Sequence, residues 1–208
     1  MPRPFKEEEK ERIRAKLLEA GRSCFLRYGL KKTTIEDVVH PTGIAKSSFY
    51  LFFDSKEALF IEVLMAELPA MTKRLLEASF GVTDDVREAL VLLMRGTVRE
   101  METNELARIL LDKRGEWQRL AEGLDYEEIL HRAAGEVFGP LYARFKQAQD
   151  EGELIEGDIF QLVYVTGLVK ILAINRDYIP PELYNAMLDL APQVIADGLT
   201  CPARRRKP

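Results

Sequence analysis

The segment Thr42–Phe60, TGIAKSSFYLFFDSKEALF, decides how this chain folds. It opens at a glycine, continues as a short run with a helical apolar period, and ends in DSKE, which is typical of the start of another helix. Ala45, Phe49 and Phe52 or Phe53 recur at the spacing of one buried helix face. The pattern therefore predicts a short helix that aromatic side chains anchor from beneath and that presents polar side chains on its other face.

A second short helix is predicted immediately upstream, over about residues 34–39. Thr33 or Thr34 is its candidate N-cap, because acidic residues follow in the first turn. The turn containing Gly43 joins it to the aromatic-anchored helix at 44–52. Helix, short turn and helix over about residues 33–52 is the helix-turn-helix arrangement, whose second helix enters the major groove of DNA. The alternative is an ordinary helical hairpin, and the aromatic anchors favour the first interpretation.

Residues 13–60 resemble the DNA-binding domain of the tetracycline-repressor-like (TetR/AcrR-type) transcriptional regulators. The matching elements are Ile13–Gly29, Thr33-Thr34, Val38, Thr42–Lys46, Phe49-Tyr50, Phe53 and Ser55–Phe60. The resemblance implies an all-α fold of about nine helices. It places a three-helix DNA-binding domain at residues 1–54 and a helical effector-binding and dimerisation domain at residues 55–208.

Four residues depart from the family's pattern within the motif. Pro41 cannot donate a backbone hydrogen bond and disfavours helix at the residue before it, so the first motif helix is expected to stop near Val39. Ser47, Leu51 and Phe52 stand where the family often has glycine, a polar residue and a histidine or tyrosine. These changes make the reading face more apolar and bear on which operator it prefers.

Charge is distributed unevenly along the chain. Residues 1–56 hold 12 Lys and Arg against 8 Asp and Glu, whereas residues 57–208 hold 18 against 26. Nucleic acid requires a positive surface on the part that touches it, so the N-terminal quarter is the predicted DNA side. The basic tail at residues 204–207 is either a solvated end or a further phosphate contact.

The resemblance and the chemistry of each side chain together assign roles at the DNA. Phosphate contacts are expected from Thr33, Thr34, Lys46, Tyr50 and Lys56, which would fix the register of the protein. Base-edge contacts are expected from Ser47 and Ser48, and a thymine-methyl contact from Leu51. The partner is a double-stranded operator with pseudo-palindromic symmetry.

The last two predicted helices, at about 158–175 and 180–198, point to a second copy of the chain. The first of them is apolar on most sides and therefore needs burial on most sides. A central core helix of a monomer would satisfy this need, and so would a partner subunit. The resemblance implies the second solution, a homodimer joined by these two helices of each subunit.

The resemblance also implies a small effector among the middle helices. Candidate wall residues, each of which is also a candidate core residue, are Met94, Met101, Leu110, Trp117, Phe138, Tyr142 and Phe145. Adaptable apolar and aromatic side chains of this kind suit a hydrophobic ligand. The effector's identity does not follow from the sequence.

Enzymatic function is not predicted, because no catalytic residues, metal ligands or cofactor motifs stand out. The two histidines, His40 and His131, lie far apart in the sequence, and no phosphate-binding glycine loop or nucleophile elbow occurs. No apolar run reaches the roughly 18 residues of a membrane span, and the N-terminus is charged, so a cytoplasmic location is expected. The leading hypothesis is an effector-released repressor; the alternatives are an activator, or an effector-independent or architectural DNA-binding protein.

Overall fold

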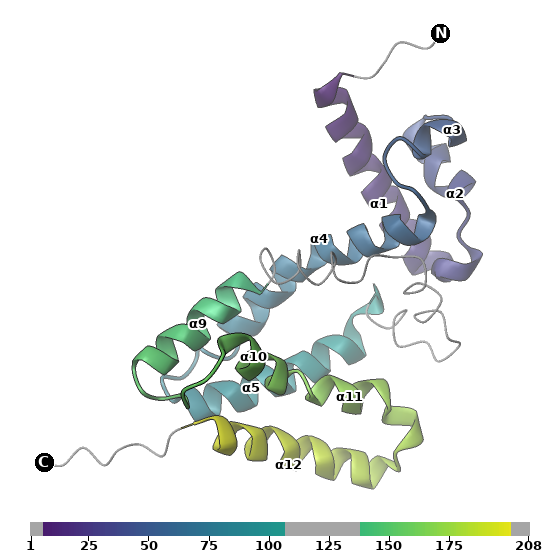
Figure 1. Ribbon diagram of the computed structural model, residues 1–208. Helices are drawn as coiled ribbons and strands as arrows, with labels where there is room; N and C mark the ends of the chain where they lie inside the picture. The colour runs from purple at the N-terminus through teal and green to yellow at the C-terminus, as the bar shows by residue number, and fades with distance from the viewer. Residues whose placement is uncertain (1–5, 107–137, 201–208) are drawn as a thin grey trace, which may run out of the picture. The chain divides into compact units, whose positions relative to one another are not determined.

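The computed structural model describes residues 6–106 and 138–200, and the helices in them confirm the predicted all-α fold class (Figure 1). The first helices along the chain are α1 (Glu7–Lys32), α2 (Ile35–Val39), the 3-10 turn η1 (His40–Thr42), α3 (Lys46–Phe49), α4 (Lys56–Glu77) and α5 (Val86–Thr103). The later ones are α9 (Gly139–Asp150), α10 (Ile159–Thr166), α11 (Val169–Ile174), the 3-10 turn η3 (Arg176–Tyr178) and α12 (Pro181–Leu199).

The described residues group into two compact units. One contains residues 6–67 with 105–106, and the other contains residues 68–104 with 138–200. Each unit has its own cluster of buried apolar side chains. The domain boundary expected between residues 54 and 55 remains a prediction.

Aromatic side chains from three helices fill the interior of the first unit. Phe25 of α1 and Phe60 of α4 are fully buried and meet edge to face, with ring centroids 5.1 Å apart. Phe49 of α3 is also fully buried and lies 5.8 Å from the ring of Phe53. Edge-to-face and tilted ring pairs stabilise a core beyond the area that they bury, so α3 is held by the same interior that joins α1 to α4.

The first helix is interrupted at Gly29. Gly29 has φ +74°, a left-handed backbone conformation that favours glycine, and a further helical turn follows it to Lys32. The helix ends at Lys32, and Thr33 and Thr34 connect it to α2. Gly29 therefore lies one helical turn before the helix-turn-helix motif.

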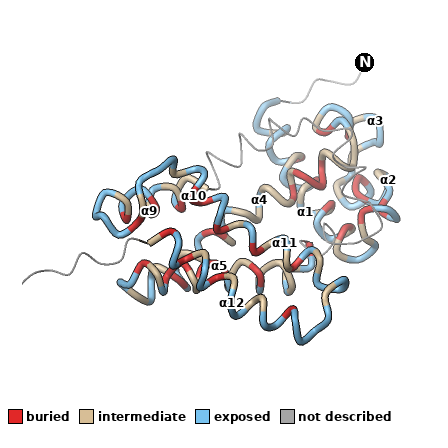
Figure 2. Tube along the Cα trace, turned by 60° about the horizontal axis from the view of Figure 1, so that its bottom comes forward, coloured by how far each residue is buried: buried red, intermediate tan, exposed pale blue. Residues whose placement is uncertain are grey.

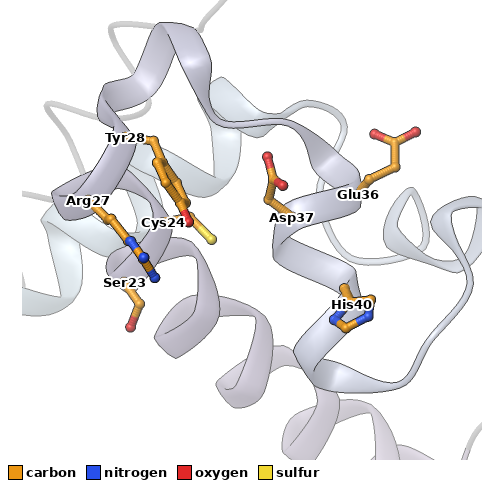
Figure 3. Close-up of a pocket in the computed structure, with 7 residues that line it drawn as sticks. All are labelled: Ser23, Cys24, Arg27, Tyr28, Glu36, Asp37 and His40. Carbon is orange, nitrogen blue, oxygen red and sulfur yellow. The ribbon is translucent and has the colours of Figure 1, made fainter.

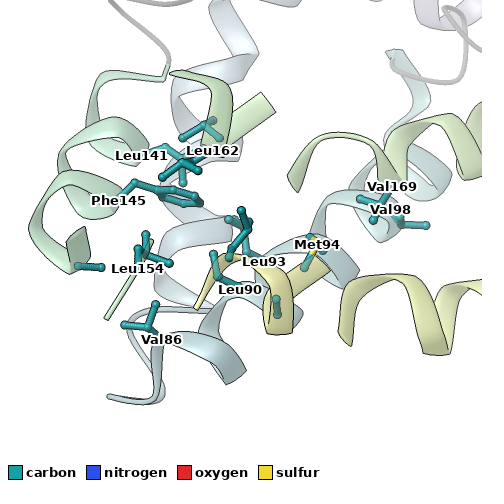
Figure 4. Close-up of a cluster of buried hydrophobic side chains, with 14 of the residues drawn as sticks. Val86, Leu90, Leu93, Met94, Val98, Leu141, Phe145, Leu154, Leu162 and Val169 are labelled. Carbon is teal, nitrogen blue, oxygen red and sulfur yellow. The ribbon is translucent and has the colours of Figure 1, made fainter. Parts of the chain in front are cut away.

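The second unit is built around α5. Its core includes Leu90, Leu93 and Met94 of α5, which lie with Phe145 of α9 and Leu162 of α10 in one cluster (Figure 4). Leu90, Met94 and Phe145 are fully buried. Asp85 caps α5 by accepting from the amide of Glu88 at 3.2 Å, which satisfies an amide at the start of this helix.

Two helices differ from expectation. The helix predicted at 158–175 is divided into α10 and α11, because Gly167 and Leu168 form tight turns between them. The N-cap of α10 is Asp158, which accepts from the Gln161 amide at 3.1 Å. By contrast, α4 continues through Pro69, although an internal proline usually interrupts a helix.

Exposure along the last helices is also uneven. Buried and exposed residues alternate along α12 (Figure 2), as on a helix with one face against the core. Among the described helices, none combines the length and the apolar character that crossing a membrane requires.

Candidate functional site

The start of the helix-turn-helix motif is fixed by a capping box. Thr34 Oγ1 accepts from the Asp37 amide at 3.2 Å, and Asp37 Oδ2 accepts from the Thr34 amide at 2.9 Å. The reciprocal bonds satisfy two amides that a helix start would otherwise leave unpaired. Hydrogen bonding from Thr34 lowers the pKa of Asp37. Of the two candidate caps, Thr34 is therefore the one used.

The turn between the two motif helices is made by Pro41 and Gly43. Helix α2 ends at Val39, as the proline predicts, and Pro41 lies in the first turn of η1, where its missing N–H removes no helical bond. Gly43 follows with φ +74° and no neighbouring atom close to where a Cβ would lie. A side chain at Gly43 would therefore meet backbone strain rather than a clash, so glycine is favoured by the direction of the turn.

Helix α3 is shorter than predicted. It spans four residues, Lys46–Phe49, rather than residues 44–52. Ala45 is extended and acts as the N-cap, and the amides of Leu51 and Phe52 bond three residues back, at 3.2 and 2.9 Å. These bonds wind the rest of the segment into a tight turn that keeps Phe49 and Phe53 buried.

The outer side of α3 and its turn carries the side chains predicted to meet DNA. Tyr50 and Leu51 are 50% and 71% exposed, values that only an outward-facing position gives to such apolar groups. Lys46 and Ser47 are exposed, and Ser48 is partly buried. Of the DNA-facing residues predicted on this segment, Lys46, Ser47, Tyr50 and Leu51 are accessible to a partner, and Ser48 is partly so.

Lys46 is not a free cation in this structure. Its Nζ lies 2.6 Å from Glu36 Oε1 of α2, and both side chains are exposed. The hydrogen bond from Lys46 lowers the pKa of Glu36, and the bond to Glu36 raises the pKa of Lys46. A phosphate approaching Lys46 would have to share its ammonium with Glu36 or replace it.

Thr33 and Lys56 are engaged in internal hydrogen bonds. Thr33 is buried, and its hydroxyl donates to the Gly29 carbonyl at 2.7 Å. The Lys56 ammonium donates to the carbonyls of Leu30 and Thr33, both at 2.8 Å, and more weakly to Lys31 at 3.3 Å. Lys56 thus joins the start of α4 to the end of α1, a role that the sequence gave no means to foresee. Phosphate contacts by both residues remain a prediction.

A hollow of about 350 Å³ lies beside the motif, between α1 and α2 (Figure 3). Its walls are Ser23, Cys24, Arg27, Tyr28, Glu36, Asp37 and His40. Burial raises the pKa of the Cys24 thiol, which keeps it protonated and a poor nucleophile. Most of these side chains are exposed and several are charged, so the hollow is a wet surface feature rather than an enclosed ligand site.

The predicted effector residues divide into core and cavity. Met94 and Phe145 are fully buried in the core of the second unit, and Met101 packs against that core. Phe138 and Tyr142 line a cavity in the second unit. Leu110 and Trp117 lie outside the described residues.

That cavity has a volume of about 80 Å³ and lies among α4, α5, α9, α10 and α11. Its walls are mostly apolar; the polar ones are Thr72, Thr97, Tyr142, Tyr164, Thr166 and Lys170. Lys170 was missed by the sequence reasoning. The signal was available, because it is the single charged residue in the apolar run from Leu162 to Ile174.

Comparisons with known proteins agree with this arrangement. Residues 17–63 match the family described as "Bacterial regulatory proteins, tetR family". The chain is 34% identical over 68 residues to the HTH-type transcriptional regulator YfiR of Bacillus subtilis strain 168, covering 33% of each chain. It is 39% identical over 51 residues to the HTH-type transcriptional repressor KstR2 of Rhodococcus jostii strain RHA1, covering 24% of this chain and 25% of the other. The chain thus spans a third or less of the length of these two relatives, and what the whole proteins do is not carried over from such matches.

Among solved structures, the chain is similar to RolR in complex with resorcinol, at a TM-score of 0.64 and 16% identity. That alignment covers 92% of this chain and 96% of RolR. At this identity the likeness speaks for the fold alone, and the fold extends over nearly all of both chains.

Proposed function

We propose, from the match of residues 17–63 to the tetR family of bacterial regulatory proteins, that this chain is a dimeric, ligand-responsive transcriptional regulator. It would bind a pseudo-palindromic operator in the cytoplasm, repress transcription when bound, and leave the DNA when a small effector binds.

The observation that carries the proposal is the exposed side of α3. A helix of four residues has no stability of its own, yet the buried rings of Phe49 and Phe53 hold it in place. It presents a lysine, serines, a half-exposed tyrosine and an exposed leucine to solvent. Cations and hydroxyls are the groups that grip phosphates and base edges, and an apolar side chain suits a thymine methyl.

The dimer is supported by the exposed apolar side chains of the second unit. Phe160, Tyr164, Leu168 and Ile171 recur on α10 and α11 and are 51 to 55% exposed. Leu183, Leu190 and Val194 recur on α12 and are 53 to 63% exposed. Helices α10 and α11 both pack against α12. Large apolar side chains that gather on adjacent helices mark an interaction surface, and two-fold pairing would cover the same residues on both subunits.

Effector binding and repression, rather than activation, are supported by a cavity and by similar proteins. A cavity is present in the second unit, and the structurally similar RolR was solved with the small molecule resorcinol. The KstR2 relative is a transcriptional repressor. An activator, or a regulator that responds to no effector, would have the same fold and the same DNA-facing helix.

Salt-dependent binding titrations on specific and scrambled duplexes test the proposed roles on α3. Tyr50→Phe removes a phosphate contact and should weaken binding to both duplexes alike. Ser47→Ala removes a base-edge contact and should mainly reduce the preference for the specific duplex. If both variants lose the same discrimination, this division of roles is wrong; if the unaltered protein binds no duplex, the proposed function fails.

A further inference from the structure

Lys170 of α11 lies among mostly apolar side chains. Of the described residues that line its cavity, none is acidic. Within the described part of the chain, the contact made by its ammonium is with the ring of Phe138, whose centroid is 5.7 Å from Nζ. An ammonium buried without an anion is strongly unfavourable, and burial accordingly lowers the pKa of Lys170.

The ammonium faces the cavity rather than packed side chains. Among the described residues, no side-chain nitrogen or oxygen is both sealed from solvent and without a hydrogen-bond partner. Lys170 is partly buried and has no hydrogen bond to another described residue, so its Nζ has to reach an opening. The cavity is that opening, and any molecule inside it meets a positive charge.

The remaining polar walls restrict what can bind there. Thr97 and Thr166 donate their hydroxyl protons to Leu93 and Val163 carbonyls of their own helices, at 2.8 and 2.7 Å. Burial raises the pKa of Tyr142, so its phenol stays a donor. Of these side chains and Lys170, the donors left for a ligand are an ammonium and a phenol O–H, both suited to an oxyanion. The hydroxyls of Thr72, which is buried, and Tyr164, which is 55% exposed, complete the polar wall.

The rest of the wall is hydrocarbon. Leu75 and Leu76 of α4, Leu93 of α5 and Leu141 of α9 contribute to it. A volume of about 80 Å³ corresponds to room for roughly six water-sized groups. One cation balances one negative charge, so a monoanion fits this site better than a phosphate dianion.

We propose that this cavity binds a small monocarboxylic acid, with its carboxylate on Lys170 and Tyr142 and its short branched or single-ring body against the leucines. The proposal rests on the proposed function, since it names the chemical class of the effector that this function requires. It also identifies Lys170 as the residue that selects acids over neutral molecules of the same shape.

Calorimetric titration of the full chain, without DNA, tests this assignment. The probes are 3-methylbutanoate and benzoate, each compared with the amide and the amine of the same shape, together with the linear acids from acetate to octanoate. We expect at least one acid to bind ten times or more tightly than its amide, and the amines not to bind. No binding by any acid, or an amide that binds as tightly as its acid, would overturn the proposal.

Three variants assign the effect to Lys170. Lys170→Met keeps the bulk and removes the charge, and should weaken binding of the acid at least tenfold; Lys170→Arg should retain part of it. Lys146→Met, on the exposed side of α9, is the control and should bind as the unaltered protein does. Thermal melting shows that Lys170→Met is folded, because removing an unpaired buried charge should raise its melting temperature. Unchanged acid binding by folded Lys170→Met would exclude this role.

Failure of this inference is distinguishable from failure of the proposed function. If DNA binding is specific but no acid binds, the regulator stands and the assignment of its ligand falls. If an acid binds through Lys170 but DNA affinity does not change, the site stands and its control of DNA binding falls.

Discussion

The two units of this protein differ in which side chains they bury and which they expose. In the first, the aromatic side chains close a complete interior and the polar groups face outward. In the second, large apolar side chains of α10, α11 and α12 lie outside and a lysine lies inside. A surface of polar groups is satisfied by water and can accept a charged partner, whereas exposed hydrocarbon and an unpaired buried charge favour an apolar partner and an anion. The difference supports the proposal that the first unit meets DNA and the second meets a subunit and a ligand.

The largest expected effect is the loss of stability when the interior of the first unit is emptied. Phe49→Ala empties the anchor of α3 and should lower the free energy of unfolding by about 3 to 5 kcal/mol, with loss of DNA binding. Its neighbour Leu51 is 71% exposed, so Leu51→Ala should change stability by less than about 0.5 kcal/mol. Urea unfolding followed by circular dichroism makes the measurement. Similar losses in the two variants would mean that α3 is not held from beneath.

The next largest effect is expected on dimerisation, when charges are placed among the exposed apolar side chains of the second unit. Leu168→Glu with Ile171→Glu places four carboxylates at a two-fold interface and should raise the dimer dissociation constant by about 100-fold or more, since like charges brought together cost several kcal/mol. Val82→Glu, an equally drastic change at a 65% exposed loop residue, is the control and should leave the dimer intact. Sedimentation velocity measures the fraction of dimer in each variant. A double variant that remains dimeric would remove this face from the interface.

A smaller loss of stability is expected where Lys56 joins the start of α4 to the end of α1. Lys56→Met removes the bonds from the ammonium to the carbonyls at the end of α1 and should cost about 1 to 2 kcal/mol of stability. Thermal and urea unfolding measure this cost, and DNA affinity at a temperature where the variant is folded measures any phosphate contact separately. Full stability with weakened DNA binding would show that Lys56 serves DNA rather than the fold.

The smallest effect concerns the capping box of α2. Thr34→Ala should destabilise the protein by about 1 kcal/mol at neutral pH. The pKa of Asp37 is lowered in the folded state by its hydrogen bonds to Thr34, so this contribution is present above the ordinary Asp pKa and is lost as pH falls through the folded value. The stability difference between the variant and the unaltered protein should therefore shrink in acid. A stability difference that grows as the pH falls would contradict the role given to the capping box of Thr34 and Asp37.

Sequence reasoning succeeded where the cause of a structure is local. Thr34 and Gly43 were predicted as a cap and a turn because the residues that they serve lie within a few positions. The whole-chain helical architecture followed from apolar periodicity together with the family resemblance.

It failed where partners are distant. Lys56 bonds to the carbonyl of Leu30, 26 residues away, and nothing in either local sequence indicates that pairing. Lys170 stands out in the sequence as a single charge within an apolar run, but the cavity that it lines is built by helices from separate stretches of the chain, so that cavity could not be predicted. The length of α3 was overestimated because tight-turn hydrogen bonds and helical ones keep the same aromatic spacing.

Selection of binding sites from a random duplex pool by the purified full-length protein tests the central claim most directly. The account predicts that the pool converges on an inverted repeat with two half-sites, bound by an even number of chains. Convergence on a single unrepeated half-site bound by one chain, or no enrichment over the starting pool, would contradict it.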